Sequence, residues 1–294
     1  MKRLSSDSLI YAFDAGMEAV AHVTPGEEVL FEAVDAFGGQ VKREGDRLTE
    51  IDFSYVNPAT GPLFVDGAEP GDSLAVHIER IELPEQGAIV TGKGMGVLGD
   101  EVDTYATKIL PIRDGQVLFD RLKIPVSPMV GVIGVAPEKG SYPTGTAHRH
   151  GGNMDTKEIA SGTTLYLPVF QPGALLALGD CHAAMGDGEV CVSGCEIPAE
   201  VSVKVELVEG KSFKWPIVER QDGFSIVVSL PSLDEAVKEA TREAVLLLAD
   251  RLSIDRVEAY LLASLGADIR ISQLVDPNLT VKAFVPRNLI GSLL

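Results

Sequence analysis

The sequence predicts a mainly β protein, built like a sandwich or barrel, with a small C-terminal α/β part that contains two helices. Several segments alternate apolar and polar residues with a period of two, as strands do when one face is buried. The 294 residues include 30 glycines and 17 prolines, which divide the chain into short elements. Two helical patterns stand out, and both lie near the C-terminus.

The predicted strands are short, and turn signals separate them. The clearest alternation covers residues 201–207, and a similar one covers 74–81, after Pro70-Gly71. Further strands are expected at residues 29–34, 163–170, 213–218, 269–275 and 279–285. This spacing of strands and turns favours a β scaffold along most of the chain.

The first predicted helix follows Ser232, which forms a capping-box pattern with Glu235. Its apolar residues recur at helical spacing: Leu233, Ala236, Val237, Ala240, Ala244, Leu247 and Leu248. A second helix is expected to begin near Ser253 and to end at Gly266. Its apolar face consists of Ile254, Val257, Leu261 and Leu265. We expect this helix pair to pack against the β scaffold.

The length allows one large domain or two moderate ones. No linker-like, low-complexity or repeated segment interrupts the chain. We therefore expect residues 1–294 to form one compact unit. A weak subdivision is conceivable into an N-terminal β part, 1–125, and a second β part, 126–294, which carries the candidate catalytic residues and the helix pair.

The composition gives a net charge of −18, from 43 acidic and 25 basic residues. Such a surface repels phosphate backbones, so nucleic acid is not an expected partner, whereas a neutral substrate is not repelled. The basic first residues are followed by no long apolar run, so neither a signal peptide nor a membrane partner is expected. The three cysteines form no disulfide framework. We expect a cytoplasmic protein.

The candidate chemistry lies in residues 146–189, which hold three of the five histidines. Residues two apart on an extended chain share a face. This spacing pairs His148 with His150, Asn153 with Asp155, and Asp180 with His182. Glycines at 151, 152, 179, 186 and 188 surround these pairs and allow close approach of the backbone to a ligand.

An Asp-x-His pair offers one oxygen and one nitrogen ligand, which suits zinc or a similar divalent metal. A metal held in this way activates water and polarises a carbonyl group. The candidate metal ligands are His150, Asp155, Asp180 and His182, with Asp35 as an additional candidate. Glu189 or Asp187 is the candidate general base. Asn153 and neighbouring backbone amides are candidates to stabilise an oxyanion.

Two alternatives remain open on the residues alone. Cys181 could act as a thiol nucleophile, although neighbouring strand residues face opposite ways, so it would not pair with His182. The cluster could also belong to a metal-stabilised binding protein for small ligands, without catalysis. Such a protein would need the metal ligands but no general base.

Several runs of residues resemble the acetamidase/formamidase family. The most specific lie close together in the chain: Gly151-Gly152-Asn153-Met154-Asp155, Leu165-Tyr166-Leu167-Pro168-Val169, and the run from Gly179-Asp180-Cys181-His182 to Gly186-Asp187-Gly188-Glu189. Earlier pieces also fit, among them Asn57-Pro58-Ala59-Thr60-Gly61-Pro62. The resemblance implies hydrolysis of short aliphatic amides such as acetamide or formamide. It also implies a mostly β fold with a small α/β part, and a homodimer or higher homo-oligomer.

Overall fold

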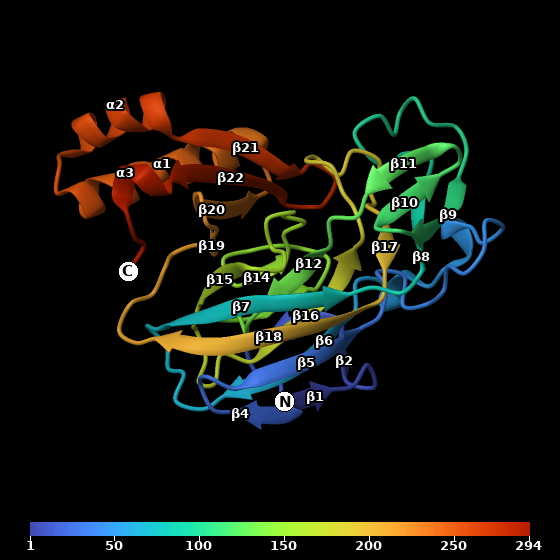
Figure 1. The fold of residues 1–294 in the computed structure, drawn as a ribbon, viewed down its shortest axis with the longest axis horizontal. Coiled ribbons are helices and arrows are strands. Elements are labelled where there is room, and N and C mark those ends of the chain that lie inside the picture. Colours follow the sequence, from blue (N-terminus) through green and yellow to red (C-terminus); the bar gives the residue numbers. More distant parts are fainter.

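The protein, described for residues 1–294 by a computed structural model, is built mainly from two large β-sheets (Figure 1). The first sheet has nine strands, in the order β1 (Lys2–Leu4), β5 (Glu28–Ala33), β18 (Ala199–Val208), β7 (Ser73–Glu82), β15 (Thr163–Pro168), β19 (Ile217–Glu219), β20 (Gly223–Leu230), β22 (Leu279–Pro286) and β21 (Asp268–Gln273). Only β1 and β5 pair in parallel in this sheet; its other pairs are antiparallel.

The second sheet has eleven strands. Its main path is β11 (Leu122–Pro125), β10 (Gln116–Phe119), β9 (Ala106–Arg113), β8 (Gln86–Thr91), β17 (Glu196–Ile197), β16 (Leu176–His182), β12 (Met129–Gly134) and β14 (Gly151–Asn153). The strand β6 (Ala59–Val65) pairs with β16, with β2 (Leu9–Ile10) and with β4 (Ala21–Val23). The remaining small elements are the pair β3 (Ala12–Asp14) and β13 (Ser141–Pro143), and the 3₁₀ turns η1 (Leu48–Glu50) and η2 (Phe53–Tyr55).

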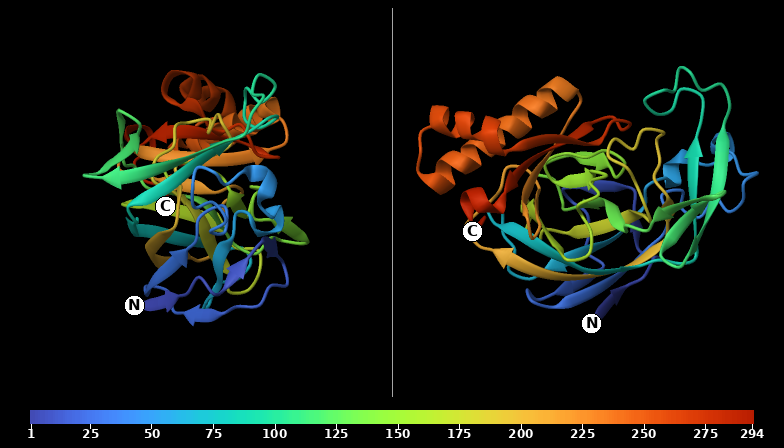
Figure 2. Two further views of the ribbon diagram at one scale, coloured as in Figure 1. Left: turned by 90° about the vertical axis from the view of Figure 1, so that its right-hand side faces the viewer. Right: turned by 45° about the horizontal axis from the view of Figure 1, so that its top comes forward.

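The main hydrophobic core lies between the two sheets. It is a cluster of 31 buried residues to which both sheets contribute, for example Phe31 and Val203 from the first sheet and Ile133 and Leu178 from the second. The right-hand view of Figure 2 shows the strands curving around this centre. Every residue of β12 and β16 is buried, so these two strands hold the polar side chains on them in fixed positions. The predicted mainly β architecture is confirmed.

The helices α1 (Leu233–Leu252), α2 (Arg256–Gly266) and α3 (Arg287–Ile290) lie at the C-terminal end, beside β20, β21 and β22 (Figures 1 and 2). The side chain of Ser232 accepts a hydrogen bond from the backbone N–H of Glu235, as the capping pattern predicts. Ala240 and Ala244 of α1 belong to a second core cluster of 18 buried residues, together with Phe224 and Val281 of the strands. The predicted helix pair is thus present and packs on the sheet.

Two local predictions need correction. The strand expected at 213–218 begins only at Ile217, after Pro216, which has no N–H to donate to a neighbouring strand. The helix α2 buries Ala259 and Ala263 against its neighbours, whereas the predicted apolar face of Val257, Leu261 and Leu265 points to solvent. Small residues let α2 approach α1 closely, so its larger apolar side chains are left outside.

Both sheets draw strands from either side of residue 125: β7 pairs with β15 and β18, and β8 pairs with β17. None of the helices is long and apolar enough to cross a membrane.

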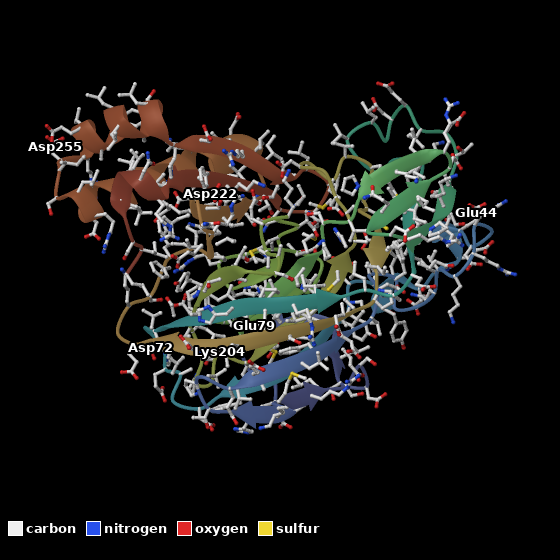
Figure 3. The ribbon with its side chains drawn as sticks, in the orientation of Figure 1. Glu44, Asp72, Glu79, Lys204, Asp222 and Asp255 are labelled. Atoms are coloured by element: carbon white, nitrogen blue, oxygen red, sulfur yellow. The ribbon has the colours of Figure 1, made fainter.

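Acidic side chains lie at well-separated places on the molecule, as Glu44, Glu79 and Asp255 show in Figure 3.

Candidate metal centre and active site

Strands β14, β16 and β17 of the second sheet, with the loops next to them, bring an imidazole and several carboxylates together. Asp180 and His182 lie on β16, two residues apart, and share a face as their spacing predicts. Asp155 follows β14, the strand that pairs with β12. Glu196 opens β17 and lies directly opposite His182 in the antiparallel register. Glu189 comes from the loop between β16 and β17.

The imidazole of His182 is at the centre of this group. Its Nε2 atom lies 3.1 Å from a carboxylate oxygen of Glu196 and 3.4 Å from one of Asp180. The carboxylates of Asp155 and Glu189 follow at 3.8 Å and 4.0 Å. Two sets of potential ligand atoms therefore share His182: one with Asp155 and Glu189, the other with Asp180 and Glu196.

These side chains are buried without sufficient partners. His182, Asp155, Asp180, Glu189 and Glu196 are all at most 6% exposed. Both ring nitrogens of His182, both oxygens of Asp155, Oδ1 of Asp180 and Oε2 of Glu196 lack a hydrogen-bond partner. Buried polar groups are normally paired, and buried charges are normally neutralised or bound to a metal. Unsatisfied oxygens of Asp155, Asp180 and Glu196 gather around Nε2 of His182, which is the arrangement expected around a cation.

The electrostatics of the group agree with this description. Burial raises the pKa of Asp155 and Glu189 well above the ordinary values, and neighbouring carboxylates raise both further. Burial likewise raises the pKa of Glu196 to about 8. For His182, burial lowers the pKa, but the charges of Glu196 and Asp180 outweigh it and raise the pKa well above its usual value. Metal-free, the site would retain protons near neutral pH, which a cation would replace.

Several residues of the site have a strained backbone with positive φ. Asp155, Asp180 and Glu189 adopt left-handed conformations, with φ of 39°, 51° and 47°, and Val192 has φ of 86°. Such a conformation costs a non-glycine residue roughly 1–3 kcal/mol and is concentrated at functional sites. The fold therefore holds three of the carboxylates in positions that local preference disfavours.

Two glycines leave room for these side chains. A Cβ atom on Gly131 of β12 would lie 2.4 Å from Oδ1 of Asp155 and 3.0 Å from Oδ2 of Asp180. A Cβ atom on Gly194 would lie 2.7 Å from Nδ1 of His182. All three distances are shorter than van der Waals contact, so only glycine fits at these positions without displacing the cluster.

Two predicted ligands lie outside the cluster. The ring of His150 packs against Phe13, Tyr142 and His148, with centroids 5.3, 5.3 and 5.7 Å away. Burial lowers the pKa of His150 to about 3, so the ring is neutral. Oδ1 of Asp35 accepts hydrogen bonds from the backbone N–H groups of Phe37 and Gly39 and stabilises a turn. Neither side chain belongs to the two sets of ligand atoms around His182.

Asp187, the other candidate base, is held by two lysines. Its carboxylate lies 2.8 Å from Nζ of Lys282 and 3.0 Å from Nζ of Lys157. Burial raises the pKa of Asp187, but the two ammonium groups outweigh it and lower the pKa overall. A carboxylate held in this way is a poor proton acceptor, because its charged form is already stabilised. Asp187 anchors the loop that carries Glu189.

The structure adds two residues that sequence reasoning missed. Glu196 had no motif, although an acidic residue between the apolar Cys195 and Ile197 is a weak signal of a buried charge. Asp276 lies between β21 and β22 in an Asp-Pro-Asn sequence, which is typical of an ordinary turn. Its Oδ2 accepts a hydrogen bond of 2.8 Å from Nδ2 of Asn153, and burial raises its pKa to about 7.

Cys181 faces away from the cluster. Its side chain is fully buried in the main core between the sheets, on the opposite face of β16 from His182. Burial strongly raises the pKa of this thiol, so the reactive thiolate is disfavoured. The residue behaves as a small apolar core side chain.

A cavity of about 150 Å³ opens beside the cluster. Its polar lining includes Asn153, Asp180, Glu189, Glu196 and Asp276. The rest of the lining is mostly apolar and comes from residues 36–57, from β8 and the loop after it, and from Val192 and Ser193 in the loop before β17. Small-molecule sites are typically concave, largely apolar and equipped with a few convergent polar groups. This cavity is therefore the candidate substrate site.

The model of the acetamidase/formamidase family matches residues 9–141 and 139–291. The chain belongs to the acetamidase/formamidase family. The resemblance predicted from the sequence runs is thus confirmed.

The fold is shared with solved members of this family. An acetamidase from Bacillus halodurans is 40% identical, with a TM-score of 0.97 over 99% of both chains. A predicted acetamidase/formamidase from Thermoanaerobacter tengcongensis is 43% identical, with a TM-score of 0.96 over 99% of this chain and 97% of the other.

The relatives found by comparing sequences alone are more distant. The formamidase of Methylophilus methylotrophus is 26% identical over 259 residues, which are 67% of this chain and 63% of that protein. The chain spans 61% to 64% of the length of the three sequence relatives it matches, so it corresponds to a little under two thirds of each.

Proposed function

We propose that this protein hydrolyses short neutral amides, such as acetamide or formamide, to a carboxylate and ammonia, with the help of a divalent metal bound at His182. The observation that carries the proposal is the set of buried, unpartnered carboxylates around one imidazole, at the end of a cavity. Family membership supplies the reaction class. The acidic surface is compatible with a neutral substrate.

The residues present fit a metal. His182, Asp180, Glu196 and Asp155 would hold it, offering one nitrogen and several oxygen atoms. Zinc accepts such a mixed set, and the abundance of carboxylates also suits manganese. When bound, the cation supplies a Lewis acid that polarises the amide carbonyl and lowers the pKa of water. We propose zinc, and elemental analysis of the purified protein distinguishes the two metals.

Glu189 is the proposed general base because it both lines the cavity and lies next to the cluster. It takes a proton from the attacking water as the water oxygen bonds to the amide carbon. It then gives the proton to the departing nitrogen as the C–N bond breaks, so that ammonia and the carboxylic acid are released. Asn153 lines the same cavity, and its hydrogen bond to Asp276 fixes its amide group near the developing oxyanion.

Substitution of neighbouring residues on β16 tests this proposal. We expect His182→Ala to lose bound metal and to reduce ammonia release from acetamide to the buffer background. Cys181→Ala is the matched control, because its side chain faces the core on the same strand; we expect it to keep its metal and most of its activity. Both variants should be checked for thermal stability.

The two alternatives give different results. A thiol mechanism predicts loss of activity in Cys181→Ala and survival in His182→Ala, the reverse of our expectation. A non-catalytic binding protein predicts bound metal but no ammonia from any amide. Near-normal turnover by a metal-free His182→Ala protein would contradict the proposed mechanism.

We also propose that the protein is a homodimer and that the outer face of α2 is its interface. Val257, Leu261 and Leu265 recur at helical spacing and are 70%, 65% and 87% exposed. In a twofold dimer the same patch meets itself, which a single apolar helical stripe can do. We expect Leu261→Glu with Leu265→Glu to shift the protein from dimer to monomer in sedimentation velocity; an unchanged dimer would place the interface elsewhere. The cytoplasmic location stays a prediction.

A further inference from the structure

A second pocket lies beside His148 and His150, the histidine pair that the cluster around His182 does not use. It has a volume of about 310 Å³ and shares no residue with the substrate cavity. Its lining comes from the loops that follow β12 and β15, the segments before β14 and β19, β13, and the end of β20. A volume of roughly 300 Å³ or more is typical of small-molecule sites.

Aromatic rings line this pocket. Tyr142, Phe170 and Trp215 all contribute to it. The imidazoles of His148 and His150 lie beside the Tyr142 ring, with centroids 4.4 and 5.3 Å away. Trp215 is only 6% exposed and belongs to the second core cluster, so its ring is fixed in place. Rings of this kind bind a planar ligand by stacking or by edge contacts.

The charged side chains of the pocket are mostly basic and are not engaged elsewhere. Arg149 lies 5.3 Å from the centre of the Phe170 ring and donates only from Nε, to the backbone oxygen of Lys214 at 3.0 Å. Both of its Nη groups therefore lack a partner. Lys139 is exposed and takes part in no ion pair, and Glu138 is the single acidic residue of the lining. In a chain of net charge −18, two unpaired cations at one pocket favour an anionic ligand.

His148 adds a third donor to the pocket. Its Nδ1 atom lies 3.3 Å from Nδ2 of Asn278, an amide group that can only donate, so Nδ1 accepts. Burial lowers the pKa of His148, so the ring is neutral and carries its proton on Nε2, which makes no hydrogen bond within the protein. His150 is 2% exposed, and its Nε2 atom also lacks a partner. Unpaired polar groups of this kind are typically completed by water, an ion or a ligand.

We propose that this pocket binds a small aromatic carboxylate. The ring of the ligand lies against the aromatic side chains, and its carboxylate accepts hydrogen bonds from Arg149, Lys139 and His148. A neutral aromatic molecule would leave these donors unpaired, and acetate would leave the rings uncovered. This binding is independent of the proposed amide hydrolysis, because the two cavities share no residue.

The fluorescence of Trp215 tests the proposal, because Trp215 is the only tryptophan of the chain and lines the pocket. Benzoate should be titrated into the wild-type protein, with benzyl alcohol and acetate as the two halves of the ligand. We expect benzoate to change the fluorescence saturably with a Kd of about 1 mM or tighter. Each half should bind at least about tenfold more weakly. Either equal binding of benzyl alcohol or no saturable response to benzoate would overturn the proposal.

Removal of metal separates this pocket from the proposed active site. Carboxylates also bind metals, so a metal held at His182 would compete for benzoate. The titration should be repeated after treatment with a chelator, with bound metal measured in the same samples. We expect the Kd for benzoate to be unchanged. Loss of the fluorescence response together with the metal would place benzoate at the metal and overturn the proposal.

Two basic residues provide matched variants. Arg149→Gln removes a charge from the pocket at an exposed position, so folding should tolerate it. Lys123→Gln is the control, because Lys123 is exposed on β11 and does not line the pocket. We expect Arg149→Gln to weaken benzoate binding about tenfold, the usual effect of losing a charge-assisted hydrogen bond, and Lys123→Gln to leave it unchanged. Equal affinities of the two variants for benzoate would contradict the proposal.

Discussion

At the scale of single residues, alternation along a strand was the most useful guide. It placed Asp180 and His182 on one face and Cys181 on the other, and the structure does the same. The same rule does not predict which part of the molecule a given strand face lies against. His148 and His150 do share a face, but their rings stack with each other, 5.7 Å apart, away from the cluster. Closeness in sequence to the Asp155 loop did not bring His150 to the site.

Glu189 and Asp187 allow a residue-level prediction, because they lie on one loop in opposite surroundings. Glu189 faces the cavity, whereas Asp187 is held by Lys157 and Lys282. We expect Glu189→Gln to lower kcat for amide hydrolysis by roughly 10²–10⁴-fold, the usual contribution of a general base. We expect Asp187→Asn to lower it by less than about tenfold, through loosening of the loop. The reverse order in a steady-state ammonia assay would exchange the two roles.

At the scale of elements, the sequence predicted the existence of strands and helices better than their orientation. The capping pattern at Ser232 located the start of α1 because that signal is local. The apolar stripe of α2 could not reveal which side faces the core, since Ala259 and Ala263 pack closely where larger residues would not fit. The strand β22 was expected from its alternation, but the ion pairs that Lys282 makes from it depend on residues more than ninety positions away.

Lys282 gives the prediction at this scale. It is fully buried on β22 and lies 2.8 Å from carboxylates of both Glu158 and Asp187. We expect Lys282→Ala to lower the free energy of unfolding in urea by about 3–5 kcal/mol, because a buried ion pair is broken and Glu158 keeps only the longer contact to Arg220, 3.5 Å away. Lys204→Ala is the control: Lys204 pairs with Glu206 at the surface, where such a pair contributes about 0–1 kcal/mol. Equal losses in both variants would contradict this account.

At the scale of the whole molecule, the site is assembled from segments that only the fold brings together. The run from 179 to 189 supplies Asp180, His182 and Glu189, and sequence motifs identified it. Glu196 joins the site because strand pairing places it opposite His182. Asp276 comes from the loop between β21 and β22 and contacts Asn153. Neither position has a local signal, because an acidic residue in a turn or at the start of a strand is usually exposed. The apolar lining of the cavity depends equally on the folded path of residues 36–56.

The central claim is that the cluster around His182 binds a metal on which amide hydrolysis depends. The most direct test is to strip the protein with a chelator and return zinc or manganese stepwise, measuring bound metal and ammonia release from acetamide in the same samples. We predict that the stripped protein is inactive and that activity rises in proportion to bound metal until the site is saturated. Full activity in the stripped protein, or binding of metal without any return of activity, would contradict the claim.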